Sequence, residues 1–195
     1  MLADILKNFR IILASKSPRR KELLSELGLT FEIEVIDTDE SFPSDLPVYE
    51  IPLYIAEKKA IPFAGKIDDS TLVITADTIV HINGEILGKP GDYAQAFDML
   101  KQLSGQWHQV VTGVCLTTSS QKTSFVAQTN VKFKNLTNEE IDYYITNYKP
   151  YDKAGAYGIQ EWIGFVAVEQ IEGSYFNVMG LPVQHLYEKL CELYS

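Results

Sequence analysis

Cysteine and long hydrophobic runs are both scarce in this sequence. Only two of the 195 residues are cysteines, Cys115 and Cys191, which lie far apart and show no CxxC or metal-ligand spacing. Cys115 falls in the apolar run VVTGVCLTT, which predicts a buried thiol on a strand, and a disulfide has no support. No apolar stretch approaches the ~20 residues of a membrane span, and the N-terminal MLADILKNFR lacks a signal-peptide pattern. These absences favour a cytoplasmic protein without membrane contact.

Positive charge is also in short supply, and several catalytic motifs are missing. The chain has 17 Lys and Arg against 26 Asp and Glu, a net charge of −9. This balance disfavours general nucleic-acid binding, which needs a broad basic face, but it does not exclude a local pocket for a small phosphate ligand. The Walker A pattern GxxxxGK[ST] and the hydrolase pattern GxSxG do not occur. His81, His108 and His185 show no ligand spacing and are predicted to be structural.

Against this acidic background, four cations gather in the segment ILASKSPRRKELL, at positions 16, 19, 20 and 21. Ser17 and Pro18 are typical of a helix N-cap and of the first helical position. Each cation at this positive end of a helix dipole costs about 0.3–1 kcal/mol. The cluster is either a solvated surface paired with nearby acids or an anion site formed by Arg19, Arg20 and free backbone N–H groups. For an anion site, we expect the helix start to be strained or mobile until a ligand binds.

The remaining chain alternates between strand-like and helix-like patterns. We expect helices at 16–28, after Pro52, at 92–105, at 137–148 and from about Val183, and strands at 10–15, 31–36, 70–87, 107–120, 122–136, around 165–171 and around 175–180. The strand run at 70–87 is interrupted near Asp77 and turns at Asn83-Gly84. This order predicts an α/β class with a mixed, partly antiparallel sheet and flanking helices. We expect one domain over residues 1–195, with two lobes around a central cleft.

Two lysines and a carboxylate stand out in the first half of the chain. Asp77 interrupts the apolar segment LVITADTIV, where a buried carboxylate must be paired, metal-bound or at a cleft. A structural Asp bonded to a nearby loop is an equally open interpretation. Lys89 precedes Pro90, which holds it in extended geometry, so it could meet phosphate oxygens or be an ordinary surface lysine. Lys59 in AEKKA is supported only by its helical spacing.

Two loops supply further candidates. The segment YDKAGAYGIQ combines small residues, which let a ligand approach the backbone, with Gln160, whose amide offers a donor and an acceptor to a base edge. A simple turn between elements is the alternative. Glu40, with Asp37 and Asp39, lies in an acidic loop that could supply a metal ligand or be merely solvated.

Seven segments in order give the chain a specific resemblance. The stretches LASKSPRRKELL, AEKKA, ADTIV, GKP, LSGQWHQVVTGV, DKAGAYGIQ and VMGLPV span nearly the whole sequence and resemble the Maf family of nucleotide pyrophosphatases. The resemblance implies a Maf/ITPase-like fold and a cytoplasmic enzyme that hydrolyses a nucleoside triphosphate to the monophosphate and pyrophosphate, with Mg²⁺ or Mn²⁺. DKAGAYGIQ is similar to the branch that acts on dTTP and UTP, including some modified pyrimidines.

The resemblance also implies roles for individual positions. Asp77 matches the catalytic proton acceptor, and Glu40 and Asp77 match the metal site. The substrate-binding positions are Ser15, Arg19 and Arg20 in the phosphate loop, Lys59 and Lys89 in the cleft, and Thr78 and Gln160, which with Arg19 are linked to substrate preference. Glu161 and Trp162 depart from many relatives, which leaves the preferred pyrimidine open.

The implied chemistry is metal-assisted attack of water on the α-phosphorus. The cations hold the triphosphate and stabilise the departing pyrophosphate, while the divalent cation activates and orients the water. Asp77 either accepts the water proton or holds the metal. The alternative is a non-catalytic nucleotide-sensing regulator of cell division that acts through a protein partner. The resemblance also allows a homodimer, although no residue pattern indicates one.

Overall fold

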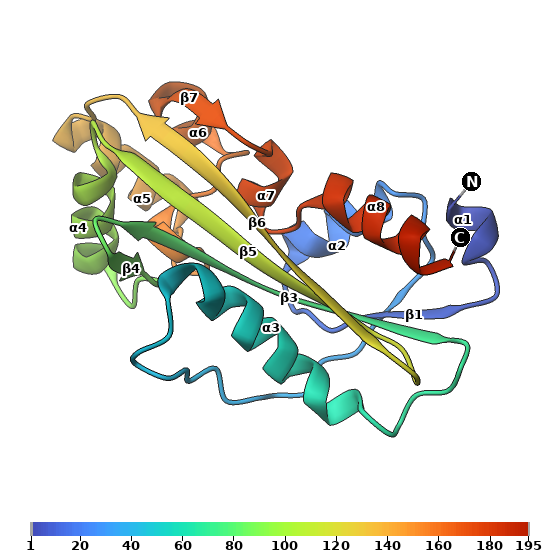
Figure 1. The fold of residues 1–195 in the computed structure, drawn as a ribbon. Coiled ribbons are helices and arrows are strands. Elements are labelled where there is room, and N and C mark those ends of the chain that lie inside the picture. The colour runs from blue at the N-terminus through green and yellow to red at the C-terminus, as the bar shows by residue number, and fades with distance from the viewer. Residues whose placement is uncertain (1, 195) are drawn as a thin grey trace. The chain divides into compact units, whose positions relative to one another are not determined.

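The structure, a computed structural model, describes residues 2–194 and divides into two compact units. Unit 1 comprises residues 1–77, 112–127 and 180–195, and unit 2 comprises residues 78–111 and 128–179. Three long strands, β3 (Thr71–Ile82), β5 (Trp107–Thr117) and β6 (Lys122–Phe133), contribute residues to both units (Figure 1). The predicted division into two parts is therefore present in the chain.

The strands form one mixed sheet in the order β2-β1-β3-β5-β6-β7, with β4 paired to β3. β1 (Arg10–Leu13) runs parallel to both β2 (Glu32–Ile33) and β3, with Ile12 opposite Glu32 and Val73. β4 (Glu85–Leu87) and β7 (Val168–Glu172) pair antiparallel with β3 and β6. The predicted mixed sheet with flanking helices is confirmed.

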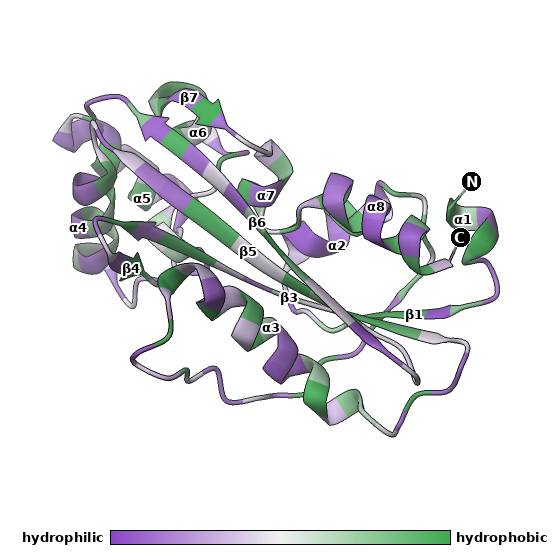
Figure 2. Ribbon diagram, in the orientation of Figure 1, coloured by the Kyte–Doolittle hydropathy of each residue, from purple (hydrophilic) through white to green (hydrophobic). Residues whose placement is uncertain are grey.

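Unit 1 packs its helices on the apolar part of the sheet. Its helical elements are α1 (Leu2–Ile5), α2 (Pro18–Ser25), η1 (Val48–Glu50), α3 (Ile51–Ala60), η2 (Ile61–Phe63) and α8 (Val183–Tyr194). Figure 2 shows β1 and the adjacent part of β3 as mainly hydrophobic, and Ile12 and Val73 are buried against Phe63. Helices α1 and α8 lie side by side (Figure 1), and the Phe9 and Tyr194 rings meet at 4.7 Å.

Two helices of unit 2 begin at residues whose side chains cap them. Its helical elements are α4 (Tyr93–Leu103), α5 (Asn138–Tyr148), η3 (Ala154–Ala156), α6 (Trp162–Ala167) and α7 (Tyr175–Met179). Asp92 caps α4, and Thr137 and Glu140 form a capping box at the start of α5. The Asn83-Gly84 turn between β3 and β4 is also confirmed, with φ of 51° and 83°.

Two local predictions are wrong, and a third strand is present with a later start. Residues 175–179 form helix α7 rather than a strand, because the Ser174 Oγ accepts the Asn177 N–H and the buried Asn177 amide donates to Val110 and Thr129. Around residues 165–171 the strand starts only at Val168, after α6. β3 continues unbroken through Asp77, since neighbouring side chains satisfy its carboxylate without a bend in the backbone.

Gly113 permits the closest approach between α3 and the sheet in unit 1. A Cβ at this position would lie 2.3 Å from both the backbone nitrogen and the Cα of Leu53. No side chain can occupy that space, so the helix that carries Lys59 rests directly on the backbone of β5. Glycine at position 113 is therefore a requirement for the observed position of α3.

A buried histidine forms part of the core of unit 2. The His108 ring meets the Tyr157 hydroxyl at 2.8 Å and packs edge-on against Phe133. Burial, together with the nearby His81, lowers the pKa of His108 to about 3. The predicted structural role of this histidine agrees with these contacts, and the neutral ring is the form that the fold requires.

In the part of the chain that runs from residue 2 to residue 194, no helix is long and apolar enough to cross a membrane.

We expect Gly113→Ala to lower the free energy of unfolding by about 3 kcal/mol, because α3 must move away from β5. The melting temperature should fall by about 6–12 °C, measured by circular dichroism. Gly88→Ala is the matched control, since a Cβ there meets nothing within 4 Å. Equal melting temperatures for the two variants would contradict the close approach.

We expect acid to destabilise the protein through His108. Because its folded-state pKa lies below the unfolded value of 6.5, protonation favours the unfolded chain and stability falls as the pH drops from about 6.5 toward 3. Between pH 7 and pH 5 the wild type should lose about 2 kcal/mol more than His108→Gln in urea unfolding. The exposed His185→Gln is the control, and an identical loss in wild type and His108→Gln would refute this assignment.

Candidate functional site

The loop between β1 and α2 has the predicted capped geometry. Ser17 is the N-cap, with its Oγ accepting the Arg20 N–H at 3.4 Å, and Pro18 begins the helix. The buried Ser15 accepts the Ser17 N–H through its Oγ at 3.2 Å. Ser17 has an ordinary extended backbone with φ of −70°, so this residue shows no strain. The expected mobility of the helix start stays a prediction. Hydrogen bonds from backbone N–H groups to the Ser15 and Ser17 hydroxyls hold this loop.

Arg20 turns away from solvent and joins three separate segments of unit 1. Its Nε donates to the Gly180 carbonyl at 2.8 Å, and its Nη1 donates to the Ala76 carbonyl at 2.9 Å and to the Ser15 Oγ at 3.3 Å. Burial lowers the pKa of the Arg20 guanidinium, and the negative charge of Asp77 partly opposes this. The cation at this helix start is therefore compensated by backbone dipoles and a nearby carboxylate.

The charge of Lys16, at the same helix start, is compensated by an ion pair at the surface. Its ammonium lies 2.8 Å from the Asp37 carboxylate, and both side chains are largely exposed. An exposed pair of this kind contributes little to stability. Of the two interpretations of the cation cluster, solvated pairing thus applies to Lys16, whereas Arg20 is directed into the protein.

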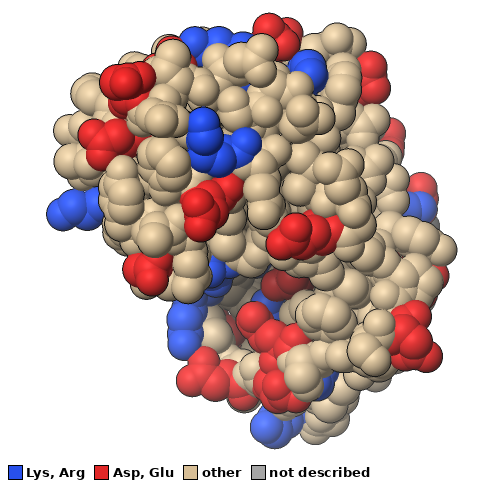
Figure 3. Space-filling model, turned by 90° about the vertical axis from the view of Figure 1, so that its left-hand side faces the viewer, with Lys and Arg blue, Asp and Glu red and all other residues tan. Residues whose placement is uncertain are grey.

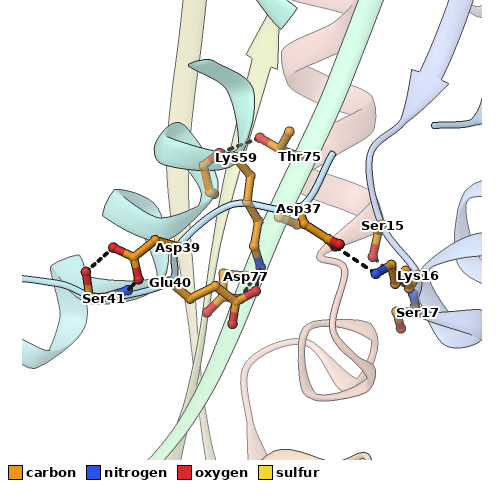
Figure 4. A network of polar contacts seen from close by, with 12 residues as sticks. Ser15, Lys16, Ser17, Asp37, Asp39, Glu40, Ser41, Lys59, Thr75 and Asp77 are labelled. Carbon is orange, nitrogen blue, oxygen red and sulfur yellow. Dashed lines mark hydrogen bonds and ion pairs between the residues drawn. The ribbon is translucent and has the colours of Figure 1, made fainter. Parts of the chain in front are cut away.

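Lys59 of α3 brings together the two acidic residues predicted for the site. Its Nζ lies 2.8 Å from Asp77 Oδ1 and 2.8 Å from Glu40 Oε1 (Figure 4). The Lys59 and Asp77 side chains are only 17% and 16% exposed, whereas Glu40 is 57% exposed. Partial removal from water strengthens the attraction between these charges. The loop, the helix and strand β3 thus converge on one charged cluster.

The acidic loop that carries Glu40 is itself anchored to α3. Asp39 accepts hydrogen bonds from Lys58 Nζ at 2.8 Å and from the Ser41 N–H, which lower the pKa of Asp39. Lys58 also donates to the Ser41 carbonyl at 2.9 Å. Consecutive lysines of one helix therefore hold consecutive acids of the loop, so Glu40 is a positioned residue rather than merely a solvated one.

The Glu40 and Asp77 carboxylates suit a hard divalent cation. Mg²⁺ is usually bound through one or two carboxylates plus substrate phosphates, and the same oxygen donors suit Mn²⁺. Within residues 2–194, no group of three or more His, Cys, Asp and Glu side chains is arranged to hold a metal. Two converging carboxylates fit a cation whose remaining ligands come from phosphate and water.

Arg19 is a half-buried residue of α2 in unit 1, and the predicted site residues that remain belong to unit 2. Thr78 follows Asp77 in β3, and the exposed Lys89 lies just after β4. Gln160 follows η3, and its Oε1 is buried without a hydrogen-bond partner in the described chain. An unsatisfied buried acceptor costs about 1–3 kcal/mol, so this oxygen is suited to a donor from a ligand.

Two groups near the site, the backbone carbonyls of Ala76 and Gly180, could not be identified from their residue types in the sequence. The Arg20 partners at Ala76 and Gly180 are backbone carbonyls, which every residue carries. Gly180 lies in the segment VMGLPV, one of the seven that carry the family resemblance, and this is the only sequence feature that marks it. Hydrogen bonds to backbone atoms depend on chain geometry rather than on residue type.

Surface charge agrees with the acidic composition. On the face drawn in Figure 3, Lys and Arg side chains are interspersed with Asp and Glu rather than gathered into one basic area. Nucleic-acid binding proteins usually carry a clustered basic patch. The face in Figure 3 therefore lacks that feature among its described residues.

Comparisons with known proteins are specific over almost the full length. The profile of the family described as Maf-like protein matches residues 10–193. The dTTP/UTP pyrophosphatase of Phocaeicola vulgatus is 56% identical, over 98% of this chain and 100% of the relative. The protein of the same name from Bacteroides fragilis is 54% identical, over 99% and 100%. That from Flavobacterium johnsoniae is 49% identical, also over 99% and 100%.

Solved structures show a more distant likeness. A dITP/XTP pyrophosphatase from Mycobacterium abscessus is 14% identical with a TM-score of 0.44, over 95% of this chain and 94% of that chain. The Ham1 protein of Staphylococcus aureus is 15% identical, also with a TM-score of 0.44, over 64% and 71%.

We expect Arg20→Lys to lower the free energy of unfolding by about 3 kcal/mol, because an ammonium cannot reach the carbonyls of Ala76 and Gly180 together. Arg10→Lys is the matched control, since Arg10 forms exposed ion pairs with Glu32 and Glu34 and should change stability by less than about 1 kcal/mol. Urea unfolding measures both. A wild-type midpoint for Arg20→Lys would show that these hydrogen bonds do not support the fold.

Proposed function

Because this chain belongs to the Maf-like protein family, we propose that it is a nucleoside triphosphate pyrophosphatase that hydrolyses dTTP and UTP to the monophosphate and pyrophosphate. Three relatives that are 49–56% identical over nearly their full length carry the name dTTP/UTP pyrophosphatase. The observation that carries the proposal is the Lys59 ammonium held 2.8 Å from both Glu40 and Asp77. Modified pyrimidine nucleotides belong to the same proposed substrate class.

We assign the divalent cation, Mg²⁺ or Mn²⁺, to Glu40 and Asp77. When bound there, it would polarise phosphate oxygens and lower the pKa of bound water. The two carboxylates already contact one cation, the Lys59 ammonium, so a divalent cation bound to both would free Lys59 for the substrate. Supporting this assignment is the donor chemistry of the pair, which is oxygen only.

The remaining chemistry is derived from the side chains of the chain. A water oxygen attacks the α-phosphorus, the bond to the bridging oxygen breaks, and pyrophosphate leaves with the electron pair. Asp77 accepts the proton of the water, a role for which its partly buried carboxylate is suited. The four predicted cations hold the triphosphate and offset the charge that develops on the leaving pyrophosphate; these are Arg19, Arg20, Lys59 and Lys89.

The base-side residues and the cellular context complete the proposal. Arg19, Thr78 and Gln160 are assigned to substrate preference, and the unsatisfied Oε1 of Gln160 supports a contact with the base. Both cysteines, Cys115 and Cys191, are free thiols, which supports the reducing cytoplasm as the compartment. A homodimer stays a prediction.

We expect the wild type to release pyrophosphate from dTTP and UTP faster than from CTP, dATP or dGTP, and only with Mg²⁺ or Mn²⁺. Asp77→Asn should lower kcat by ~100-fold or more, because it removes the proton acceptor, with an unchanged circular dichroism spectrum. Asp45→Asn, an exposed change of the same charge, is the control. Nucleotide binding without any turnover would instead favour the nucleotide-sensing regulator, and near-normal turnover of Asp77→Asn would remove Asp77 from catalysis.

A further inference from the structure

Gln160 lies in a tight turn of unit 2. The Glu161 N–H donates to the Gly158 carbonyl at 3.0 Å, which closes a four-residue turn with Gln160 at its third position. The turn follows η3, where Gly155 and Ala156 both have left-handed backbones, with φ of 67° and 59°. A left-handed alanine is strained and persists only where its surroundings impose it. The conformation of the Gln160 segment is therefore held by contacts from outside it.

One hydroxyl group contacts both ends of this turn. The Tyr144 Oη accepts the Gly158 N–H at 3.0 Å and donates to the Glu161 carboxylate in a short hydrogen bond. Tyr144 comes from α5 and is completely buried. Burial and the Glu161 charge both raise the pKa of Tyr144, so the hydroxyl keeps its proton and acts as donor and acceptor at once.

The second oxygen of Glu161 is held by a buried lysine. Lys153 is only 7% exposed, and its Nζ lies 3.1 Å from Glu161 Oε1 and 2.8 Å from Asp152 Oδ1. Both carboxylate oxygens of Glu161 are thus engaged, one by Tyr144 and one by Lys153. A buried charge that loses its partner is strongly unfavourable, so this arrangement allows little movement of the turn.

Packing around Gly158 restricts the turn further. A Cβ at Gly158 would lie 2.9 Å from Glu161 Cδ and 3.1 Å from Lys153 Cε. The ion pair therefore lies directly against the backbone two residues before Gln160. Hydrogen bonding and packing act on the same short segment, and neither involves the Gln160 amide itself.

The orientation of that amide has consequences for base recognition. Its buried Oε1 is an acceptor without a donor in the described chain. Thymine and uracil present an N3–H donor between two carbonyl acceptors, whereas N3 of cytosine is an acceptor. A Gln160 amide whose Oε1 faces N3 accepts the N3–H of thymine or uracil, whereas the same oxygen would face the acceptor N3 of cytosine.

We infer that Tyr144, Glu161 and Lys153 are positioning residues that fix the Gln160 amide for thymine and uracil, an inference that rests on the proposed hydrolysis of dTTP and UTP. Tyr144 forms hydrogen bonds to both ends of the turn, and the ion pair with Lys153 keeps the Glu161 carboxylate in position to accept one of them. Their effect is on base discrimination and not on the phosphate chemistry, which is assigned to Asp77 and to the cations that hold the triphosphate, Lys89 of unit 2 among them.

The first experiment removes one oxygen atom. Tyr144→Phe keeps the ring and loses both contacts to the turn, and Tyr143→Phe, an exposed tyrosine on the same helix, is the matched control. We expect Tyr144→Phe to raise the KM for dTTP and UTP by about tenfold while kcat stays within about twofold. The dTTP-over-CTP ratio of kcat/KM should fall, and the inhibition constant of inorganic tripolyphosphate should not change.

A double-mutant cycle separates positioning from general support of the fold. If Tyr144 acts through Gln160, Tyr144→Phe in a Gln160→Ala background adds nothing to the KM of Gln160→Ala alone. The inference would be overturned if the two substitutions raised the KM by the product of their separate effects. It would also be overturned if Tyr144→Phe raised the tripolyphosphate inhibition constant as much as the KM. Glu161→Gln keeps an acceptor for Tyr144 but loses the ion pair with Lys153, so it is the variant to use if Tyr144→Phe does not fold. An unchanged KM and dTTP-over-CTP ratio in folded Glu161→Gln would also overturn the inference.

The wild-type reaction distinguishes this inference from the proposed function. If the wild type is active and Tyr144→Phe leaves the KM and the dTTP-over-CTP ratio unchanged, only the positioning role is overturned. A wild type that hydrolyses neither dTTP nor UTP overturns the proposed function and the inference with it.

Discussion

Two carboxylates that approach each other in a partly buried site need a cation between them, and in this chain Lys59 supplies it. Its ammonium is shared between Glu40 and Asp77 at 2.8 Å from each. Without that charge, the mutual repulsion would favour protonation of one acid or a wider separation. The position of α3 is therefore an electrostatic requirement as well as a packing one, and Gly113 is the residue that lets α3 approach the sheet so closely.

The balance of charge around Lys59 also bears on the proposed reaction. A triphosphate brings several negative charges and a divalent cation brings two positive ones, so their arrival together can exchange the partners of Lys59 without leaving a buried charge unpaired. Arg20 already donates to Ser15, Ala76 and Gly180 through its Nε and Nη1, and its predicted contact with the triphosphate stays a prediction. Its position supports the loop, β3 and the C-terminal segment around the acid.

Arg20 in unit 1 and Tyr144 in unit 2 have the same structural role. Each is a polar side chain that holds an irregular segment by bonding to its backbone, Arg20 through carbonyl acceptors and Tyr144 through the Gly158 N–H. Irregular backbone lacks the repeating partners of a helix or strand, so its polar groups must be satisfied by such side chains. This constraint explains why loops that carry candidate site residues are accompanied by buried polar groups.

The sequence by itself determined the caps, the turn at Asn83-Gly84, the mixed sheet and the identity of the acidic and basic candidates, because these depend on neighbours a few residues away. It was wrong at residues 175–179, where contacts from Val110 and Thr129 override the strand propensity of aromatic residues. Only the tertiary structure decided that Lys59 lies between Glu40 and Asp77, that Arg20 bonds to backbone carbonyls, and that Tyr144 fastens the Gln160 turn. Those contacts join residues 14 to 160 positions apart, and no local pattern specifies such distances.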